Sequence, residues 1–243
     1  MEGPRVKFIS EKLDPIFKNK IITAMWGNSK KIDFNEFLGK EIVNITSNGK
    51  NLIIKIKNLG IIKIHFLMYG SYSIDKLNKD KSKVRVAIES DFNKVYFYNC
   101  SVEFLKRFKK NSKDIMAYDW KPADVLGSLK NNNGYICDVL LDQSILPGVG
   151  NIIKVEALYR AKVHPLSVTS KIKKTVLKKI LIETRKFSEI FYSTAVNGES
   201  LKSYLLCYGK KICINCGGKI IRKKLGKLKR FSYFCSNCQV LYK

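Results

Sequence analysis

The chain has 243 residues and a formal net charge of +26, with 45% hydrophobic residues and a sequence pI near 9.8. This hydrophobic content excludes a basic disordered tail, and the length is sufficient for two or three small domains. The charge suggests a polyanionic partner, and RNA, DNA and anionic lipid all fit it. No run reaches the ~18 apolar residues of a membrane span and no signal-peptide pattern opens the chain, so we expect an intracellular protein with no membrane partner.

The first part of the chain, residues 1–100, is predicted to form a β-sandwich fronted by one helix. Apolar residues follow helical spacing over 4–18, where Pro4 suits the first turn because its missing N–H has no helical partner there. Two β-hairpins are then predicted from alternating apolar runs, LIIKIK (52–57) with IIKIHF (61–66), and VRVAIES (84–90) with KVYFYN (94–99).

From about residue 102 the apolar period becomes helical, and a helical domain is predicted over 101–205. The clearest helix lies within 170–192, where lysines occupy the face opposite the apolar one. Its predicted apolar face comprises Ile172, Val176, Ile180, Phe187 and Phe191. Three cysteines outside the C-terminal motif, Cys100, Cys137 and Cys207, are expected to be reduced and buried.

The last predicted domain, residues 206–243, contains two Cys-x-x-Cys pairs, formed by Cys213, Cys216, Cys235 and Cys238. Two such knuckles supply four thiolates for one closed structural Zn²⁺ site, with an iron centre or redox pairs as alternatives. Seven Lys and Arg residues and no acid lie between the pairs. We expect metal binding to supply the folding energy of this hairpin and to leave its surface free for phosphates or a groove; a solvated basic loop is the alternative.

A second motif, LPGVGNIIKVEAL, spans residues 146–158. Gly148 and Gly150 predict a tight turn with positive φ, and Asn151 is predicted to cap the helix that follows. Backbone N–H groups at such a helix start form a phosphate pocket, although the turn could be only a structural connection. LPGVG also occurs in helix-hairpin-helix proteins, whose base-excising members place a catalytic Asp some twenty residues further on. No Asp follows Asp142, which argues against that class.

The order of motifs along the chain resembles the formamidopyrimidine-DNA glycosylase and endonuclease VIII family, and more closely its Nei-like branch. These motifs are MEGP at the start, GKNL at 49–52, HFLMYG at 65–70, LDQ at 141–143, LPGVGN with EAL, and a four-Cys ribbon ending in CQ. The resemblance covers essentially the whole chain. It implies a β-sandwich, a helix-two-turn-helix domain and a zinc finger, in a monomer that excises oxidised bases flipped out of double- or single-stranded DNA.

The resemblance also assigns roles to single residues. Glu2, which by itself would pass for an ordinary exposed acid, matches the essential acid beside the nucleophile, and Lys50 matches a phosphate-binding residue near the lesion. Asn151 and Arg230 match residues of the helical domain and the zinc-finger hairpin that bind DNA. Met68 matches the residue that fills the void left by the flipped base, with a simple core Met as the alternative.

Three departures from the family pattern affect these expectations. Family members usually begin Met-Pro-Glu-Gly-Pro and use the proline amine, whereas here Met1 directly precedes Glu2. The remaining void-filling residues are not visible in 98–105. The segment between SLKSY (200–204) and Tyr208 is too short for the loop that covers 8-oxoguanine in the guanine-type enzymes.

We therefore expect the α-amine of Met1 to attack C1′ of the damaged nucleotide, with Glu2 as acid and base. An α-amine, with a pKa of ~7.8, is roughly 30% neutral at pH 7.4, against ~0.1% for Lys. The predicted protein is a bifunctional DNA glycosylase and AP lyase that removes oxidised pyrimidines and hydantoins but little 8-oxoguanine. A non-catalytic zinc-ribbon protein that binds nucleic acid and a basic RNA-binding protein of the translation apparatus are the alternatives.

Overall fold

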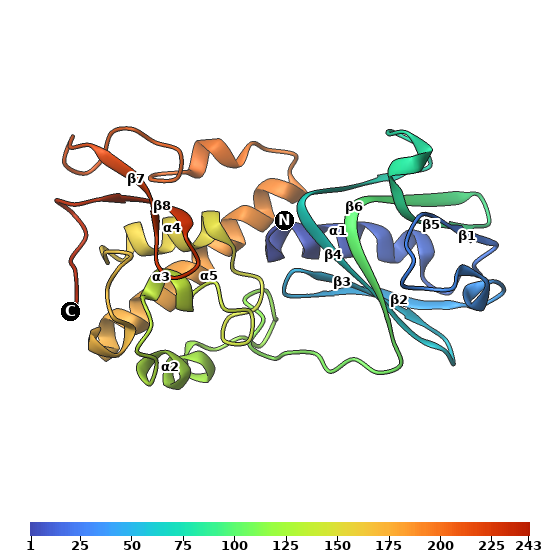
Figure 1. The fold of residues 1–243 in the computed structure, drawn as a ribbon, viewed down its shortest axis with the longest axis horizontal. Coiled ribbons are helices and arrows are strands. Elements are labelled where there is room, and N and C mark those ends of the chain that lie inside the picture. Colours follow the sequence, from blue (N-terminus) through green and yellow to red (C-terminus); the bar gives the residue numbers. More distant parts are fainter. The chain divides into compact units, whose positions relative to one another are not determined.

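The computed structural model describes residues 1–243, which divide into two compact units (Figure 1). The first unit comprises Met1 and Arg5–Lys110, and the second comprises Glu2–Pro4 and Asn111–Lys243. The helical region and the Cys-rich hairpin thus belong to one unit. No helix of the chain is both long and apolar enough to cross a membrane.

The first unit contains a six-stranded antiparallel sheet in the order β1-β5-β6-β4-β3-β2. Its strands are β1 (Ala24–Trp26), β2 (Ile42–Asn48), β3 (Asn51–Ile56), β4 (Gly60–Ile74), β5 (Val84–Ser90) and β6 (Asn93–Leu105), with single turns of 3-10 helix at η1 (Phe34–Phe37) and η2 (Lys81–Lys83). Both predicted hairpins are present. The predicted sandwich is built from one sheet, because the long strands β4 and β6 pair with each other through both halves.

Helix α1 (Gly3–Phe17) supplies the helical side of the core of the first unit. Its residues Val6, Ile9, Leu13 and Phe17 are fully buried and belong to the same apolar cluster as the strands. The spacing predicted from the sequence is thereby confirmed, except that Ile16 is only partly buried. Pro4 lies in the first turn, as predicted.

Strand β4 leaves its ladder with β6 at one place. Phe66 pairs with Cys100 and Ser71 with Tyr98, so four residues of β4, from Leu67 to Gly70, lie opposite one residue of β6. That residue, Asn99, has a positive φ of 48°. We refer to residues 67–70 as the β4 excursion. The remainder of β6 is regular strand, so the region searched for void-filling residues forms no loop.

The second unit is built around four helices, α2 (Pro122–Lys130), α3 (Ile136–Val139), α4 (Asn151–Arg160) and α5 (Lys174–Val196), with 3-10 turns η3 (Thr169–Lys171) and η4 (Leu201–Tyr204). Helix α5 confirms the predicted amphipathic helix, and its buried face includes Ile180 and Phe187. Ile172 is also buried but precedes the helix. Cys137 and Cys207 are buried here and Cys100 in the first unit, as expected.

The C-terminal hairpin consists of β7 (Ile220–Leu225) and β8 (Arg230–Cys235). Leu225 and Phe234 join the apolar cluster of the helices. Asp138 of α3 accepts hydrogen bonds from the backbone N–H groups of Lys227 (2.7 Å) and Leu228 (3.3 Å) in the turn. The hairpin therefore has apolar and polar anchors in the helical region in addition to its four cysteines.

Candidate active site and metal centre

The α-amino group of Met1 lies at the start of the β4 excursion. It donates to the carbonyl oxygens of Phe66 (3.4 Å) and Leu67 (3.3 Å), and the Met1 side chain packs against the core of the first unit. These contacts hold the amine at the place where β4 departs from its ladder.

The N-terminal amine, Lys50 and Lys63 all act electrostatically on His65 of strand β4. Lys50 is the second residue of the two-residue turn between β2 and β3, and the next residue, Asn51, pairs with His65 of β4. Burial lowers the pKa of His65, and the positive charges of the N-terminal amine, Lys50 and Lys63 lower it further. The first unit thus brings together Met1, Lys50 and a His65 that favours its neutral form, a residue to which the sequence analysis gave no role.

Glu2 is the anion at the start of helix α4. Its carboxylate accepts hydrogen bonds from the backbone N–H groups of Gly150 (3.2 Å), Ile152 (2.7 Å) and Ile153 (3.2 Å). The first-turn N–H groups of a helix have no helical acceptor and carry its positive end, so this position stabilises a carboxylate. The prediction of a phosphate pocket here is wrong in this respect, since a side chain of the same chain already uses these donors.

The two glycines of the turn, Gly148 and Gly150, are required for different physical reasons. Gly148 has a φ of +95°, and its carbonyl accepts a hydrogen bond from the N–H of Gly3 at 2.8 Å. Gly150 has a φ of −118°, so the predicted positive φ is wrong for this residue. A Cβ atom at Gly150 would overlap with the carboxylate carbon of Glu2. Gly150 is therefore required by close approach and not by backbone conformation.

Asn151 begins helix α4 but does not cap it. The N-cap residue is Gly150, and the N–H groups of Ile152 and Ile153 are capped by the carboxylate of Glu2, which corrects the prediction for Asn151. Its Oδ1 instead accepts a hydrogen bond from Nζ of Lys154 at 2.8 Å. Lys154 also donates to the Phe231 carbonyl (3.3 Å) and to Oγ of Ser232 (3.1 Å). This lysine therefore connects Asn151 to strand β8.

Lys154 is almost fully buried, with 1% of its surface exposed. Burial lowers the pKa of Lys154 to about 8, and the nearby charge of Arg230 also lowers it, whereas Cys137, Asp138 and Glu2 oppose this shift. Arg230 itself is exposed at the first position of β8, where it pairs with Leu225. Asn151, Lys154 and Arg230 thus belong to one charged neighbourhood of the second unit.

Met68 is at the centre of the β4 excursion and does not contribute to the core. Its side chain is 67% exposed, and the flanking Leu67 and Tyr69 are 49% and 77% exposed. This exposure rules out the alternative that Met68 is a simple core residue. The excursion also lines a cavity of about 510 Å³ together with Arg85 and Lys31.

The four cysteines of the C-terminal motif meet at one point. The ligand atoms of Cys213, Cys216, Cys235 and Cys238 all lie within 4.8 Å of one another. The Sγ atoms of Cys213 and Cys238 are 3.8 Å apart, and those of Cys216 and Cys235 are 3.5 Å apart. Tetrahedral Zn²⁺ with bonds of about 2.3 Å places sulfur atoms ~3.8 Å apart, so this set fits a metal ion.

Two side chains outside the cysteines hold this cluster. The backbone N–H of Cys235 donates to Oε1 of Gln239 (2.9 Å), whose Nε2 donates to the Val163 carbonyl (2.7 Å). The hydroxyl of Tyr159 lies 3.1 Å from Sγ of Cys213. Both residues are buried, and they attach the two knuckles to the helical region.

The sequence analysis assigned no role to Lys154, Glu156 or Gln143. Gln143, part of the LDQ motif, donates to the carbonyls of Leu141 and Val149 and accepts from the N–H of Gly148. Lys154 and Glu156 both lie in the quoted motif, but a charged residue on a helix is ordinarily exposed. Two charged residues among the thirteen mainly apolar residues of this motif were the only available signal.

Comparison with known proteins identifies the family. Residues 1–105 match the model of the formamidopyrimidine-DNA glycosylase N-terminal domain, and residues 112–202 match that of the formamidopyrimidine-DNA glycosylase H2TH domain. The chain therefore belongs to the formamidopyrimidine-DNA glycosylase and endonuclease VIII family, as its motifs suggested. The predicted fold class, with its β domain, helix-two-turn-helix region and Cys-rich hairpin, is confirmed.

Individual relatives come from both branches of the family. The chain is 30% identical to endonuclease 8-like 3 of Bos taurus over 87% of its length, but it spans only 37% of that protein. It is 29% identical to formamidopyrimidine-DNA glycosylase of Oceanobacillus iheyensis, with 98% of this chain and 97% of the relative covered. A crystal structure of the Lactococcus lactis glycosylase on DNA with an AP site shares the fold, with a TM-score of 0.84 at 20% identity over 98% of this chain and 99% of the other.

Proposed function

We propose that this protein is a bifunctional DNA glycosylase and AP lyase of base excision repair. The proposal rests on how the structure holds the amine of the first residue and the carboxylate of the second. The amine of Met1 is held at the β4 excursion, and the carboxylate of the next residue is fixed by three backbone N–H groups of the α4 start. Since Met1 and Glu2 are consecutive, the chain itself keeps an amine and a fixed carboxylate one residue apart.

This pair suits the chemistry of base removal. The amine forms a bond to C1′ while the bond from C1′ to the damaged base breaks. Opening of the C1′–O4′ bond then gives a Schiff base, and elimination of the 3′ phosphate from it cleaves the abasic strand. An unprotonated α-amine is far more abundant near neutral pH than an unprotonated lysine with an ordinary pKa. Glu2 then serves as the group that accepts and returns protons during these steps.

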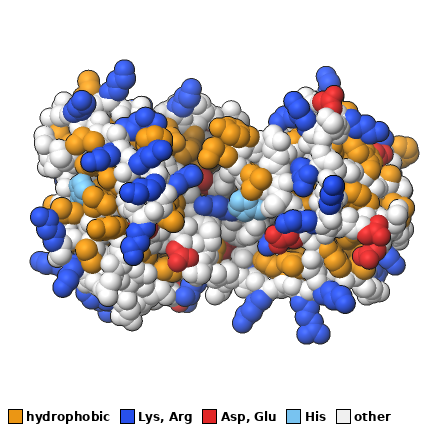
Figure 2. Space-filling model, viewed as in Figure 1, with side chains coloured by type: hydrophobic (Ala, Val, Ile, Leu, Met, Phe, Trp, Pro, Cys, Tyr) orange, Lys and Arg blue, Asp and Glu red, His pale blue; other side chains and the backbone are white.

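The partner in this proposal is damaged DNA, bound by a single chain. Lys50 and Arg230 would contact phosphates, and the Nδ2 of Asn151 would donate to a phosphate oxygen while Lys154 holds its Oδ1. The exposed Met68 would enter the stack where a base has been flipped out. The basic surface of the chain favours such a polyanionic partner (Figure 2).

For the four-Cys cluster we propose one structural Zn²⁺. All four sulfur atoms would be ligands, which leaves no open position for a substrate or a water molecule. The ion would therefore fix the two knuckles and take no part in base removal.

The proposed substrates are oxidised pyrimidines and hydantoins derived from guanine, in double or single strands. Residues 98–105 continue strand β6 and offer no loop to hold the opposite strand. Residues 205–208 directly follow η4 and are too few for a cover over 8-oxoguanine. An enzyme with few opposite-strand contacts loses little when that strand is absent.

The test is borohydride trapping on DNA that contains an abasic site, followed by peptide mapping of the adduct and N-terminal sequencing of the protein. We expect the adduct on the α-amine of residue 1. Lys50→Ala is the matched control, since it removes a competing primary amine of the same unit yet should still be trapped. An adduct that maps to Lys50, or no adduct with a protein whose N-terminus is Met1, would contradict the proposal and favour a binding protein without catalysis.

A further inference from the structure

One face of the β7–β8 hairpin packs against the helical core. The other face is buried at Ile220 and Cys235 and is partly open from Arg222 to Lys224. In the ladder, Lys223 pairs with Ser232, and Arg222 and Lys224 pair with Tyr233 and Phe231. Side chains alternate along a strand, so the face that carries Ser232 is opposite the face that carries Phe231 and Tyr233. The first face is inward, because Ser232 is buried and bonded to Lys154 while Leu225 and Phe234 join the helical core.

The open face carries cations stacked on aromatic rings. The guanidinium of Arg222 lies 3.7 Å from the centre of the Phe231 ring, and Nζ of Lys224 lies 5.4 Å from the same centre. Nε of Arg222 also donates to the Tyr233 hydroxyl at 3.1 Å. The Tyr233 ring lies 4.9 Å from the ring of Tyr208. We call this row, Tyr208, Tyr233, Arg222, Phe231 and Lys224, the aromatic stripe.

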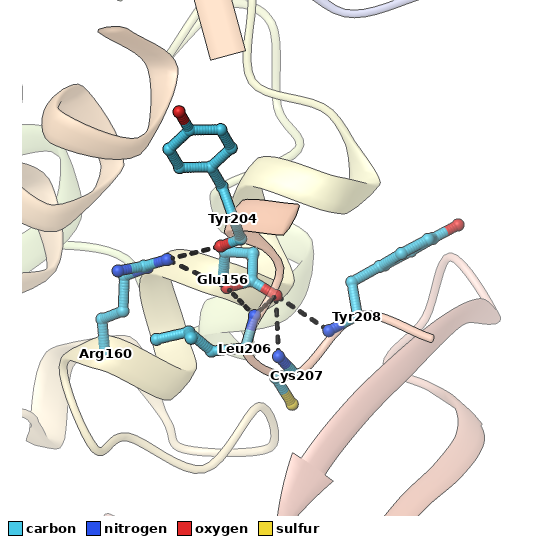
Figure 3. A network of polar contacts seen from close by, with 6 residues as sticks. All are labelled: Glu156, Arg160, Tyr204, Leu206, Cys207 and Tyr208. Carbon is cyan, nitrogen blue, oxygen red and sulfur yellow. Dashed lines mark hydrogen bonds and ion pairs between the residues drawn. The ribbon is translucent and has the colours of Figure 1, made fainter. Parts of the chain in front are cut away.

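One end of the aromatic stripe is fixed by a buried carboxylate. Glu156 of α4, with no exposed surface, accepts hydrogen bonds from the backbone N–H groups of Leu206 (3.1 Å), Cys207 (2.9 Å) and Tyr208 (2.8 Å). Figure 3 shows these bonds converging on the carboxylate while the Tyr208 side chain extends away from it. The position of Tyr208 beside Tyr233 is thereby built into the fold.

We propose that the aromatic stripe binds single-stranded DNA. Successive bases would stack on the rings of Phe231, Tyr233 and Tyr208, and Arg222 and Lys224 would contact the phosphates. Aromatic rings interleaved with cations are the usual platform for single strands, because every base has a flat face and stacking tolerates any sequence. The hairpin region supports an anionic occupant, since residues 214–234 contain seven Lys and Arg and no acid.

This surface differs from the one assigned to Arg230. Arg230 pairs with Leu225, so both belong to the inward face of the ladder, and the aromatic stripe lies on the other face. The inference does not depend on base excision, because an undamaged strand would bind in the same way. If the proposed glycosylase activity were disproved, the inference that the aromatic stripe binds single-stranded DNA would be unaffected.

The experiment measures binding of the full chain to fluorescein-labelled oligothymidylate, and to the corresponding undamaged duplex, by fluorescence anisotropy at fixed ionic strength. Stacking of one base on an aromatic side chain is worth ~1–3 kcal/mol, so Phe231→Ala should weaken single-strand binding about tenfold. Phe231→Trp should retain it. Lys224→Ala should weaken single-strand binding more than Lys223→Ala does. Lys223→Ala is the matched control, because it removes one positive charge from the neighbouring residue on the other face.

Photo-crosslinking with an oligonucleotide that contains 5-iodouracil gives a second reading, and thermal unfolding and metal content verify that each variant is folded. Crosslinks should map to Phe231, Tyr233 or Tyr208. The inference is overturned if Phe231→Ala binds the single strand as tightly as the unmodified chain does. It is also overturned if Lys223→Ala and Lys224→Ala lose the same amount of single-strand affinity. Losses on the duplex as large as those on the single strand would also overturn it.

Discussion

The carboxylate of Glu2 accepts a hydrogen bond from the backbone N–H of Ile152 at 2.7 Å, across a separation of 150 residues. The start of the chain is thus bound to the start of a helix in the middle of the sequence. Gly150, two residues before Ile152, makes this approach possible, since a Cβ atom there would overlap with Glu2.

Gly150→Ala should therefore reduce base excision as strongly as Glu2→Gln, because the displaced carboxylate can no longer exchange protons during the reaction at residue 1. We expect a loss of a hundredfold or more, on the order of general acid–base contributions. Single-turnover excision from a lesion-containing duplex is the measurement.

Gly127→Ala is the control for this substitution. A Cβ atom at Gly127, within α2, meets nothing within 4 Å, so the variant should be fully active and slightly more stable. Normal activity in Gly150→Ala would show that the position of Glu2 is not needed for excision.

A second prediction concerns the buried Lys154. Its pKa is lowered to about 8 in the folded chain, against 10.5 as the ordinary value. Between these two values the unfolded chain binds more protons than the folded one, so this residue makes the free energy of unfolding rise with pH from about 8 to 10.5. The full rise would be ~3 kcal/mol at most, at 1.36 kcal/mol per pKa unit.

Lys154→Met should remove this part of the pH dependence. Urea unfolding at pH 7.5 and pH 10 measures it, followed by Trp120 fluorescence in a Trp26→Phe background so that the signal reports the second unit. Lys178→Met, an exposed lysine of α5, is the control and should keep the slope of the unmodified chain. Equal slopes for both variants would contradict the assignment.

Much of the fold follows from local pattern, and the exceptions have physical reasons. The two hairpins and α5 have clear periods of 2 and 3.6. On the predicted apolar face of α5, Ile180 and Phe187 are buried, whereas Val176 and Phe191 are only partly buried. Strand β1 has only three residues and was not predicted, because its pairing with β5 is a tertiary contact. The β4 excursion was also missed, since HFLMYG continues the strand composition on both sides.

The sequence analysis named individual residues of the candidate site but did not predict the contacts between them. Motifs located Glu2, Asn151 and the cysteines, yet the partners of Glu2 lie about 150 residues away and no local rule indicates them. Lys154 and Glu156 were missed because a buried charge is stabilised by backbone groups of distant segments. The sequence around these two residues is that of an ordinary helix.

Metal loading is the third prediction. Each chain should hold one Zn²⁺, and Cys216→Ser should lose it, whereas Cys100→Ser should retain it because Cys100 lies in the sheet. Since Leu225, Phe234 and Asp138 also anchor the hairpin, the second unit should remain folded without metal. Elemental analysis gives the loading, and amide hydrogen exchange should show faster exchange confined to the knuckles and strands β7 and β8. Global unfolding of Cys216→Ser would mean that metal is the main source of hairpin stability.

The fourth prediction addresses Met68 and substrate choice. Met68→Ala should slow excision of a hydantoin from duplex DNA by about tenfold or more, and from a single strand much less, because only the duplex leaves a void when a base is flipped. Leu38→Ala, another exposed apolar residue of the first unit, should change neither rate. Comparison of thymine glycol, a hydantoin and 8-oxoguanine completes the test. Fastest action on 8-oxoguanine in duplex would contradict the proposed substrates.

The β4 excursion has one more consequence, for how such chains diversify. Its two ends are closed by separate ladder pairs, Phe66 with Cys100 and Ser71 with Tyr98. Residues inserted or deleted between these pairs change the reach of the protruding segment without shifting either flanking register. The Met1 amine, which donates hydrogen bonds to the carbonyls of Phe66 and Leu67, would keep its place through changes that begin after Leu67. Length variation after Leu67 therefore offers a route to new specificity that leaves the proposed nucleophile undisturbed.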